Sequence, residues 1–352
     1  MRSRFLAAVL LSACGAGSPP GRDAAPGPDA PSPDRGSPAD APARPANPTC
    51  RAPAQPVPAG LEGLPARLSV TGCFDPADPT RPLPALIAYQ VTVPLWSDGA
   101  EKDRWLALPD GARIQVDPDG DFRLPPGSVL IKTFRLDQRR VETRFFVRHP
   151  GGEWSGYTYQ WNEAGTDALL LDEGSHRVRV GDRDWHFPSR AECHTCHTPA
   201  AGHALGLEVA QLDRGAQLAA LAALDLFEAP PPKTTALPGE ASAPLAERAR
   251  AYLHANCSGC HRPGVGNTGT SDLRFATAFA DTHTCGAEPL KGSLGLGADL
   301  RIIAPGQPEK SMVVVRMREL ASGRMPPVAS LRVDEAAVGL ISDWIRGLPA
   351  CP

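Results

Sequence analysis

Two short clusters of thiol and imidazole side chains hold the residues best suited to chemistry in this sequence. The first is ECHTCHT at residues 192–198, and the second is NCSGCHRPG at residues 256–264. Each contains two cysteines separated by two residues and followed at once by a histidine. This C-x-x-C-H pattern is the attachment signature of c-type haem.

The spacing suits that chemistry. The two vinyl groups of a haem need two thiols about one helical turn apart, and the adjacent histidine then reaches the iron from the same side. The sequence therefore predicts two covalently attached haem c groups. The predicted thioether bonds are to Cys193, Cys196, Cys257 and Cys260, and the predicted proximal iron ligands are His197 and His261.

Two other uses of these cysteines compete with haem attachment. Four cysteines with histidines could bind zinc, and a C-x-x-C pair could be a redox dithiol. Both leave the histidine at the same place in each cluster unexplained, so haem is favoured.

A second iron ligand is predicted for the later cluster only. Met325 stands in GRMPP, in a loop held by two prolines, and its soft sulfur favours ferrous iron. Met312 and Met317 lie on an apolar helical stretch and suit core packing. The first cluster has no methionine in its own region, so its iron is bis-histidine, bound by another base, or five-coordinate. His203, in AGHALG, is the candidate histidine.

Nine cysteines also indicate the compartment. Four belong to the clusters and Cys14 ends LSAC, which leaves four that are free to pair. Outside the cytoplasm spare cysteines form disulfides, and four allow three connectivities. Chain proximity favours Cys50–Cys73 and Cys285–Cys351.

The N-terminus reads as an export signal. A basic MRSR and a short apolar FLAAVLL precede LSAC, which resembles a bacterial lipobox in which Cys14 is lipidated. We therefore expect a lipoprotein signal peptide over residues 1–14 and a disordered, Pro/Ala-rich tether over residues 15–48. Gly15 follows Cys14 at the position where aspartate would resemble an inner-membrane retention signal. We therefore expect the lipid anchor in the outer membrane, with the chain facing the periplasm or the cell surface.

The elements that must position the clusters differ between two regions. Residues 49–239 predict a β-rich haem-binding domain, because short runs of β-branched and aromatic residues recur, as at 91–96, 128–136 and 139–149. One helix is expected around 207–224. Residues 240–352 predict helices before the second cluster, near Pro308, and at the C-terminus, where Asp334 is the expected N-cap. The predicted fold class is α+β, a β-rich domain followed by an all-α cytochrome c-like domain.

Four segments carry a resemblance to a known family. PLWSDGAEKDRWLALPDGARI, PPGSVLIKTF, ETRFFVRHPGGEWSGYTYQWNEAGTDA and FPSRAECHTCHT together resemble a family of bacterial exported dihaem cytochromes. The resemblance implies a β-rich domain before a cytochrome c domain and does not identify a substrate. The β-rich part is also similar to hydroxylamine-oxidising cytochromes with a lysine-crosslinked haem, where Lys132 would be the counterpart; a solvated strand lysine is the favoured interpretation.

These observations favour an electron carrier over a catalyst. The expected partners are periplasmic or membrane redox proteins, with a lipid anchor to the membrane. A net charge of −3 does not indicate a nucleic-acid-binding surface. The alternative is a haem enzyme or gas-binding protein that takes hydroxylamine, peroxide or another small ligand at an open first haem.

Overall fold

The computed structural model describes residues 43–54, 64–239, 241–266, 269–328 and 330–352. The predicted signal peptide, the predicted lipidation site at Cys14 and most of the predicted tether lie outside these residues. The segment Ala41–Pro352 forms one compact unit. No helix in the described part of the chain has the length and apolar character needed to cross a membrane.

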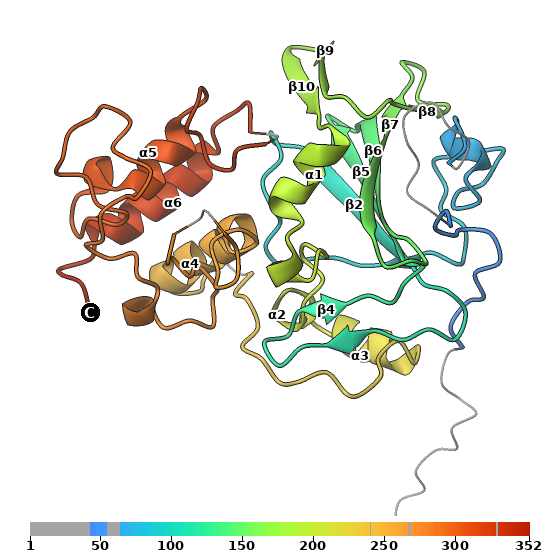
Figure 1. Ribbon diagram of the computed structural model, residues 1–352, viewed down its shortest axis with the longest axis horizontal. Helices are drawn as coiled ribbons and strands as arrows, with labels where there is room; N and C mark the ends of the chain where they lie inside the picture. Colours follow the sequence, from blue (N-terminus) through green and yellow to red (C-terminus); the bar gives the residue numbers. More distant parts are fainter. Residues whose placement is uncertain (1–42, 55–63, 240, 267–268, 329) are drawn as a thin grey trace, which may run out of the picture. The chain divides into compact units, whose positions relative to one another are not determined.

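A six-stranded antiparallel sheet forms the first part of this unit, with strand order β1-β2-β5-β6-β7-β8 (Figure 1). Two short hairpins, β3–β4 and β9–β10, accompany it. The strands are β1 Ile87–Ala88, β2 Glu101–Ala107, β3 Gln115–Val116, β4 Phe122–Arg123, β5 Val129–Leu136, β6 Arg139–Arg148, β7 Trp154–Trp161, β8 Ala168–Leu170, β9 His176–Val180 and β10 Arg183–Phe187. The expected strands at 128–136 and 139–149 correspond to β5 and β6. Asp137 and Gln138 join them with positive φ angles of 47° and 66°, as a tight two-residue hairpin requires.

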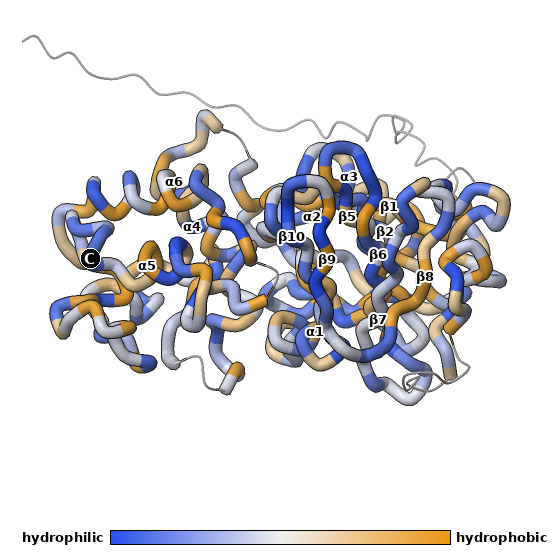
Figure 2. The backbone as a smooth tube through the Cα atoms, turned by 90° about the horizontal axis from the view of Figure 1, so that it is seen from above, coloured by the Kyte–Doolittle hydropathy of each residue, from blue (hydrophilic) through white to orange (hydrophobic). Residues whose placement is uncertain are grey.

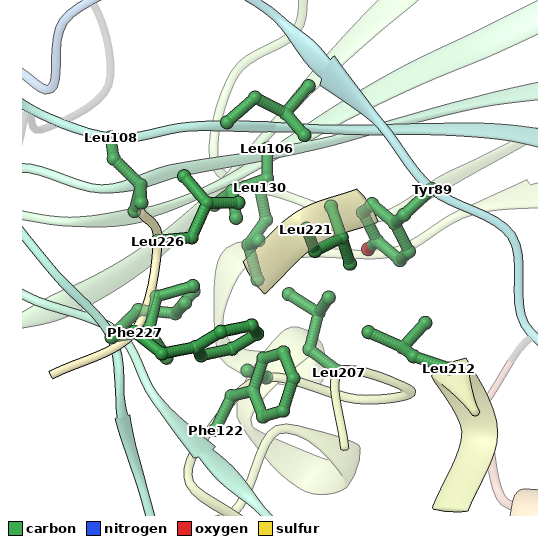
Figure 3. Packing of buried hydrophobic residues seen from close by; sticks show 14 of the residues in the cluster. Tyr89, Leu106, Leu108, Phe122, Leu130, Leu207, Leu212, Leu221, Leu226 and Phe227 are labelled. Atoms are coloured by element: carbon green, nitrogen blue, oxygen red, sulfur yellow. The ribbon is translucent and has the colours of Figure 1, made fainter. Parts of the chain in front are cut away.

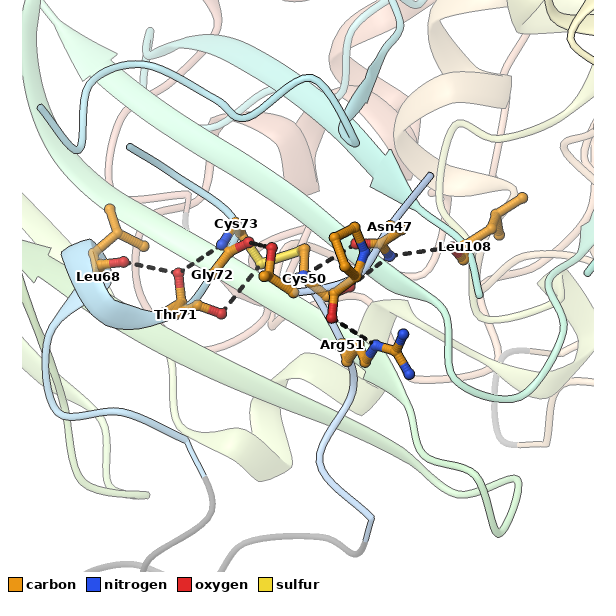
Figure 4. Close-up of a disulfide and its surroundings, with 10 residues drawn as sticks. Asn47, Cys50, Arg51, Leu68, Thr71, Gly72, Cys73 and Leu108 are labelled. Atoms are coloured by element: carbon orange, nitrogen blue, oxygen red, sulfur yellow. Dashed lines mark hydrogen bonds between the residues drawn. A yellow bond between two sulfur atoms is a disulfide. The ribbon is translucent and has the colours of Figure 1, made fainter. Parts of the chain in front are cut away.

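Both faces of the central strands are buried. Along β6, Phe145 and Val147 point into a core with Tyr159 and Trp161 of β7. The disulfide Cys50–Cys73 closes this core (Figure 4). Beside it, the buried Asn47 side chain donates to the main-chain oxygens of Cys50 and Leu108 and fixes the incoming chain against the sheet.

The opposite face of the sheet packs on a second core. Leu106, Leu130 and Phe146 from three strands meet the short helices α2 Val209–Leu212 and α3 Gln217–Ala223 (Figure 3). The sequence predicted one helix here, but Gly215, at φ 55°, separates two. The break lets Leu212 and Leu221 enter the same core from different directions.

The expected strand at 91–96 is irregular backbone. The side-chain amide of Gln211 replaces a strand partner there. Its Oε1 accepts from the Val93 N–H at 2.9 Å, and its Nε2 donates to the Val93 carbonyl at 2.9 Å. The β-branched residues that suggested a strand are therefore held by one buried glutamine.

The C-terminal part contains three α-helices, α4 Leu245–Cys257, α5 Met312–Arg318 and α6 Glu335–Arg346. Hydrophobic and hydrophilic residues alternate along them (Figure 2), and their apolar sides share one core around Ile341 and Trp344. Asp334 caps α6 by accepting from the Ala337 N–H at 3.0 Å, as expected. The disulfide Cys285–Cys351 ties the chain end to this part.

The predicted all-α cytochrome c-like domain is wrong. The molecule is β-rich with few helices, and in the described residues between α4 and α5 the chain forms turns, single 3₁₀ turns and isolated β-bridges but no α-helix. Glycines and prolines explain the difference, because Pro263, Gly264, Pro289 and Gly292 interrupt any helical run. The predicted division at residue 240 stays a prediction.

Candidate functional site

The first C-x-x-C-H cluster lies on a short helix that follows directly from the β10 hairpin. Helix α1, Arg190–Cys196, begins with a reciprocal cap, in which Glu192 N donates to Ser189 Oγ at 3.1 Å and Ser189 N donates to Glu192 Oε2 at 2.7 Å. This capping box fixes the helix start. Cys193 and Cys196 thus stand one helical turn apart, and α1 lies against β7 of the sheet (Figure 1).

His197 ends α1 in the state that an axial ligand needs. Its Nδ1 donates to the main-chain oxygen of His203 at 2.5 Å, which leaves Nε2 available. Its ring stacks on Phe146 of β6 with centroids 3.9 Å apart. Burial, and secondly the positive charge of Lys132, lower the pKa of His197 well below its usual value, so the imidazole is neutral.

His203 holds His197 rather than facing the first cluster's cavity. Its Nδ1 donates to the main-chain oxygen of His197 at 2.9 Å, and its ring stacks on Trp154. These two bonds lock the loop that carries His197. The sixth-ligand role predicted for His203 stays a prediction, and sequence reasoning missed the contribution of its carbonyl.

The second cluster lies at the end of α4. Cys257 is the last residue of the helix, and the N–H groups of Cys260 and His261 both donate to its carbonyl, at 3.1 and 2.8 Å. Burial raises the pKa of the Cys257 thiol to about 12, so it is a neutral thiol in this structure. The turn presents both thiols and the imidazole at one helix end.

The two clusters touch each other. Cys260 Sγ donates to the main-chain oxygen of Thr195 at 3.0 Å, and the neighbouring Cys260 thiol raises the pKa of the Cys196 thiol. A Cβ added to Gly259 would lie 2.9 Å from Leu205 Cδ2. The glycine in the second cluster therefore allows the close approach. Nothing in the spacing along the chain indicates this contact between segments more than sixty residues apart.

Ion pairs hold the second cluster against the β-rich part. Arg262, directly after His261 and 5% exposed, pairs with Asp121 at 2.6 Å and Asp119 at 2.9 Å. His254 of α4 bonds Glu208 at 2.8 Å. Burial raises the pKa of Asp121 to about 6 although Arg262 opposes that rise.

A cavity of about 110 Å³ adjoins the first cluster. Cys193, Cys196 and His197 line it on one side. Apolar side chains form much of the remaining wall, and four basic residues, all on the central strands, complete it: Lys102, Arg104, Lys132 and Arg144. An apolar pocket with two thiols and an imidazole on one wall fits a covalently attached haem.

Lys132 is a cavity-wall residue and not a solvated strand lysine. It lies on β5, and its Nζ donates to the Leu205 carbonyl at 3.3 Å. Burial lowers its pKa to about 7. The role suggested by the resemblance to hydroxylamine-oxidising cytochromes stays a prediction.

Met325 lies in a half-buried loop, where its N–H donates to the Arg316 carbonyl at 2.9 Å. Met312 is buried and Met317 packs against the helical core, as expected for core residues. Iron ligation by Met325 stays a prediction. In the described part of the chain, no group of three or more His, Cys, Asp and Glu side chains is arranged to bind a metal ion.

Comparisons with protein-family models, with curated proteins and with solved structures find no match to this chain.

Proposed function

We propose that this protein is a dihaem c-type cytochrome that transfers electrons. One haem would be attached to Cys193 and Cys196 with His197 on the iron, and the other to Cys257 and Cys260 with His261 on the iron. Each haem would supply one-electron chemistry, while the chain attaches it, orients its histidine and excludes water.

The contact between the two clusters carries this proposal. The hydrogen bond from Cys260 Sγ to the Thr195 carbonyl places one attachment point of the second haem beside Cys196, an attachment point of the first. Two redox groups anchored this close exchange electrons readily. The shared contact therefore favours an electron-transfer unit.

The geometry of the first cluster supports the same conclusion. His197 is neutral, keeps Nε2 free and is held by the His203 carbonyl, as a permanent iron ligand should be. The second haem would take Met325 as its other ligand, on the argument of a soft sulfur in a proline-bounded loop.

The cellular setting is part of the proposal. Covalent haem attachment and two disulfides suit a protein exported from the cytoplasm. With a lipid on Cys14, the chain would be tethered to the outer membrane, and its partners would be periplasmic or membrane redox proteins.

The test is mass spectrometry of the purified mature protein together with EPR spectra with and without cyanide or hydroxylamine. We expect the added mass of two haems and two low-spin centres that neither compound alters. A mass without haem would refute the proposal. A high-spin haem that binds either compound would replace electron transfer with the haem-enzyme or gas-binding alternative.

A further inference from the structure

A row of like charges crosses the sheet beside the first cluster. Arg104 of β2 lies directly opposite Lys132 of β5, which lies directly opposite Arg144 of β6. All three side chains line the cavity, together with Lys102 of β2. Like charges that face each other across strands destabilise a sheet, so this row requires a compensating negative charge.

In the described residues, one end of the row forms an ion pair with a carboxylate. Arg144 makes two bonds to the carboxylate of Glu142, at 2.6 and 2.8 Å. The carboxylate next to Arg104 on β2, that of Asp103, pairs with Arg135. The carboxylate of Glu192, which also lines the cavity, bonds His186 and Ser189.

The other cations have only main-chain oxygens as acceptors. Lys102 donates to the Leu95 carbonyl, Arg104 to the Lys102 carbonyl at 3.2 Å, and Lys132 to the Leu205 carbonyl. Among the residues that the structure describes, none of these three cations forms an ion pair with a carboxylate. Burial lowers the pKa of both Lys102 and Arg104, which shows the cost of holding them charged without a partner.

The cations of the row lie at increasing distance from the two thiols, with Arg144 nearest and the β2 residues farthest. Arg144 interacts electrostatically with both Cys193 and Cys196, and Lys132 interacts with Cys196. Strand β2, which carries Lys102 and Arg104, lies two strand spacings beyond β6, or about 10 Å. Since Lys102 and Arg104 are two residues apart, they point to the same face of the sheet.

A haem carries its two vinyl groups on one edge and its two carboxylates on the opposite edge. We propose that Lys102 and Arg104 bind the two carboxylates of the haem attached through Cys193 and Cys196. The haem then lies along the row of cations, with its thioether edge at β6 and its carboxylate edge at β2. This assignment rests on the proposed function, because it takes the attached group to be a haem.

The first test is a redox titration of the full-length holoprotein in which both cations are neutralised, K102Q/R104Q. A cation near a haem favours the reduced iron, which carries less positive charge. Loss of the Lys102 and Arg104 charges should shift the reduction equilibrium of the first haem about threefold or more toward the oxidised form. The matched control is R139Q/K291Q, which removes one arginine and one lysine from exposed positions and should shift neither haem.

A second measurement covers the effect of the substitutions on folding. In the holoprotein, K102Q/R104Q should lower the midpoint of thermal unfolding, because two haem carboxylates lose their partners. In a C193A/C196A chain, which cannot attach this haem, the same substitutions should raise the midpoint, because the repulsion and the cost of burying two charges that are removed outweigh the two hydrogen bonds to main-chain oxygens that are lost. The sign of the effect should therefore depend on the haem.

The outcomes separate this assignment from the proposed function. A holoprotein with two haems, an unchanged titration and the same sign of stability change in both chains would overturn the carboxylate assignment alone. A wild-type chain that carries no haem would overturn the proposed function instead.

Discussion

The hydroxyl of Thr198 donates a hydrogen bond to the main-chain oxygen of Gly259 at 2.7 Å. Thr198 is the last residue of the first cluster and follows His197 directly, and Gly259 stands between the two cysteines of the second. The bond is largely shielded from water, since Thr198 is 6% exposed. It fixes the distance between the clusters independently of any group attached to them.

Replacing Thr198 by valine should therefore destabilise the fold. Thr198→Val keeps the shape of the side chain and leaves the Gly259 carbonyl without this donor, which costs about 1 to 2 kcal/mol. Urea denaturation would measure the loss. Thr235→Val, at an exposed threonine, is the control, and an equal effect of the two substitutions would contradict the role given to this bond.

Gly156 of β7 gives Cys193 its space. A Cβ at Gly156 would overlap the Sγ of Cys193 and lie 3.0 Å from its Cβ. Gly156→Ala should therefore displace this thiol and prevent haem attachment at the first cluster, while the second cluster keeps its haem. Mass spectrometry should show a protein that is lighter by one haem.

The control for this substitution is Gly174→Ala, because the added Cβ there meets only one atom, at 3.7 Å. That variant should keep both haems. Two intact haems in Gly156→Ala would show that α1 can move away from β7, and the prediction would be wrong.

Local patterns in the sequence anticipated local features of the structure. The alternation in 139–149 gives β6, and Asp334 caps α6 as its side-chain type suggests. The cysteine pairs expected from chain proximity are those joined in the structure. For the strand, the helix cap and the Cys50–Cys73 pair, the interacting groups lie near each other in the sequence or repeat with the period of the element, whereas Cys285–Cys351 joins residues 66 positions apart.

The arrangement of the site depends on contacts between distant segments, which no single-sequence pattern encodes. The residue pattern of β6 does not indicate a cavity beside the strand, but Arg144 and Phe146 line one. Gln211 holds the irregular chain at Val93, and Arg262 reaches Asp121 across the sequence. The C-terminal helices suggested a known all-α domain, but the glycine- and proline-rich stretch between them cannot continue a helix.

Replacing Met325 tests the proposed second ligand of the later haem. Met325→Ala should remove the sulfur-to-iron absorption band of the oxidised protein and lower the reduction potential of that haem, because a thioether favours ferrous iron. Absorption spectroscopy of the purified protein measures the band. Met317→Ala, at a methionine that packs against the helical core, should keep it. A band that persists in Met325→Ala would contradict the assignment.

The carboxyl of Asp121 should make the free energy of unfolding fall as the pH rises, which is opposite to the effect of a carboxyl whose pKa is lowered on folding. Burial raises the pKa of this carboxyl to about 6 in the folded chain. Between pH about 4 and about 6, the folded chain therefore holds a proton that the unfolded chain has released. Raising the pH through this window favours unfolding, and the contribution of Asp121 falls by about 3 kcal/mol at most.

Asp121→Asn removes this titration. The free energy of unfolding of Asp121→Asn, relative to the wild type, should rise as the pH increases from about 4 to about 6, since only the wild type loses stability through this group. Urea denaturation at a series of pH values measures the difference. Asp213→Asn, at an exposed carboxyl, controls for the loss of one negative charge. Parallel stability curves for Asp121→Asn and the wild type would mean that Arg262 keeps Asp121 ionised throughout.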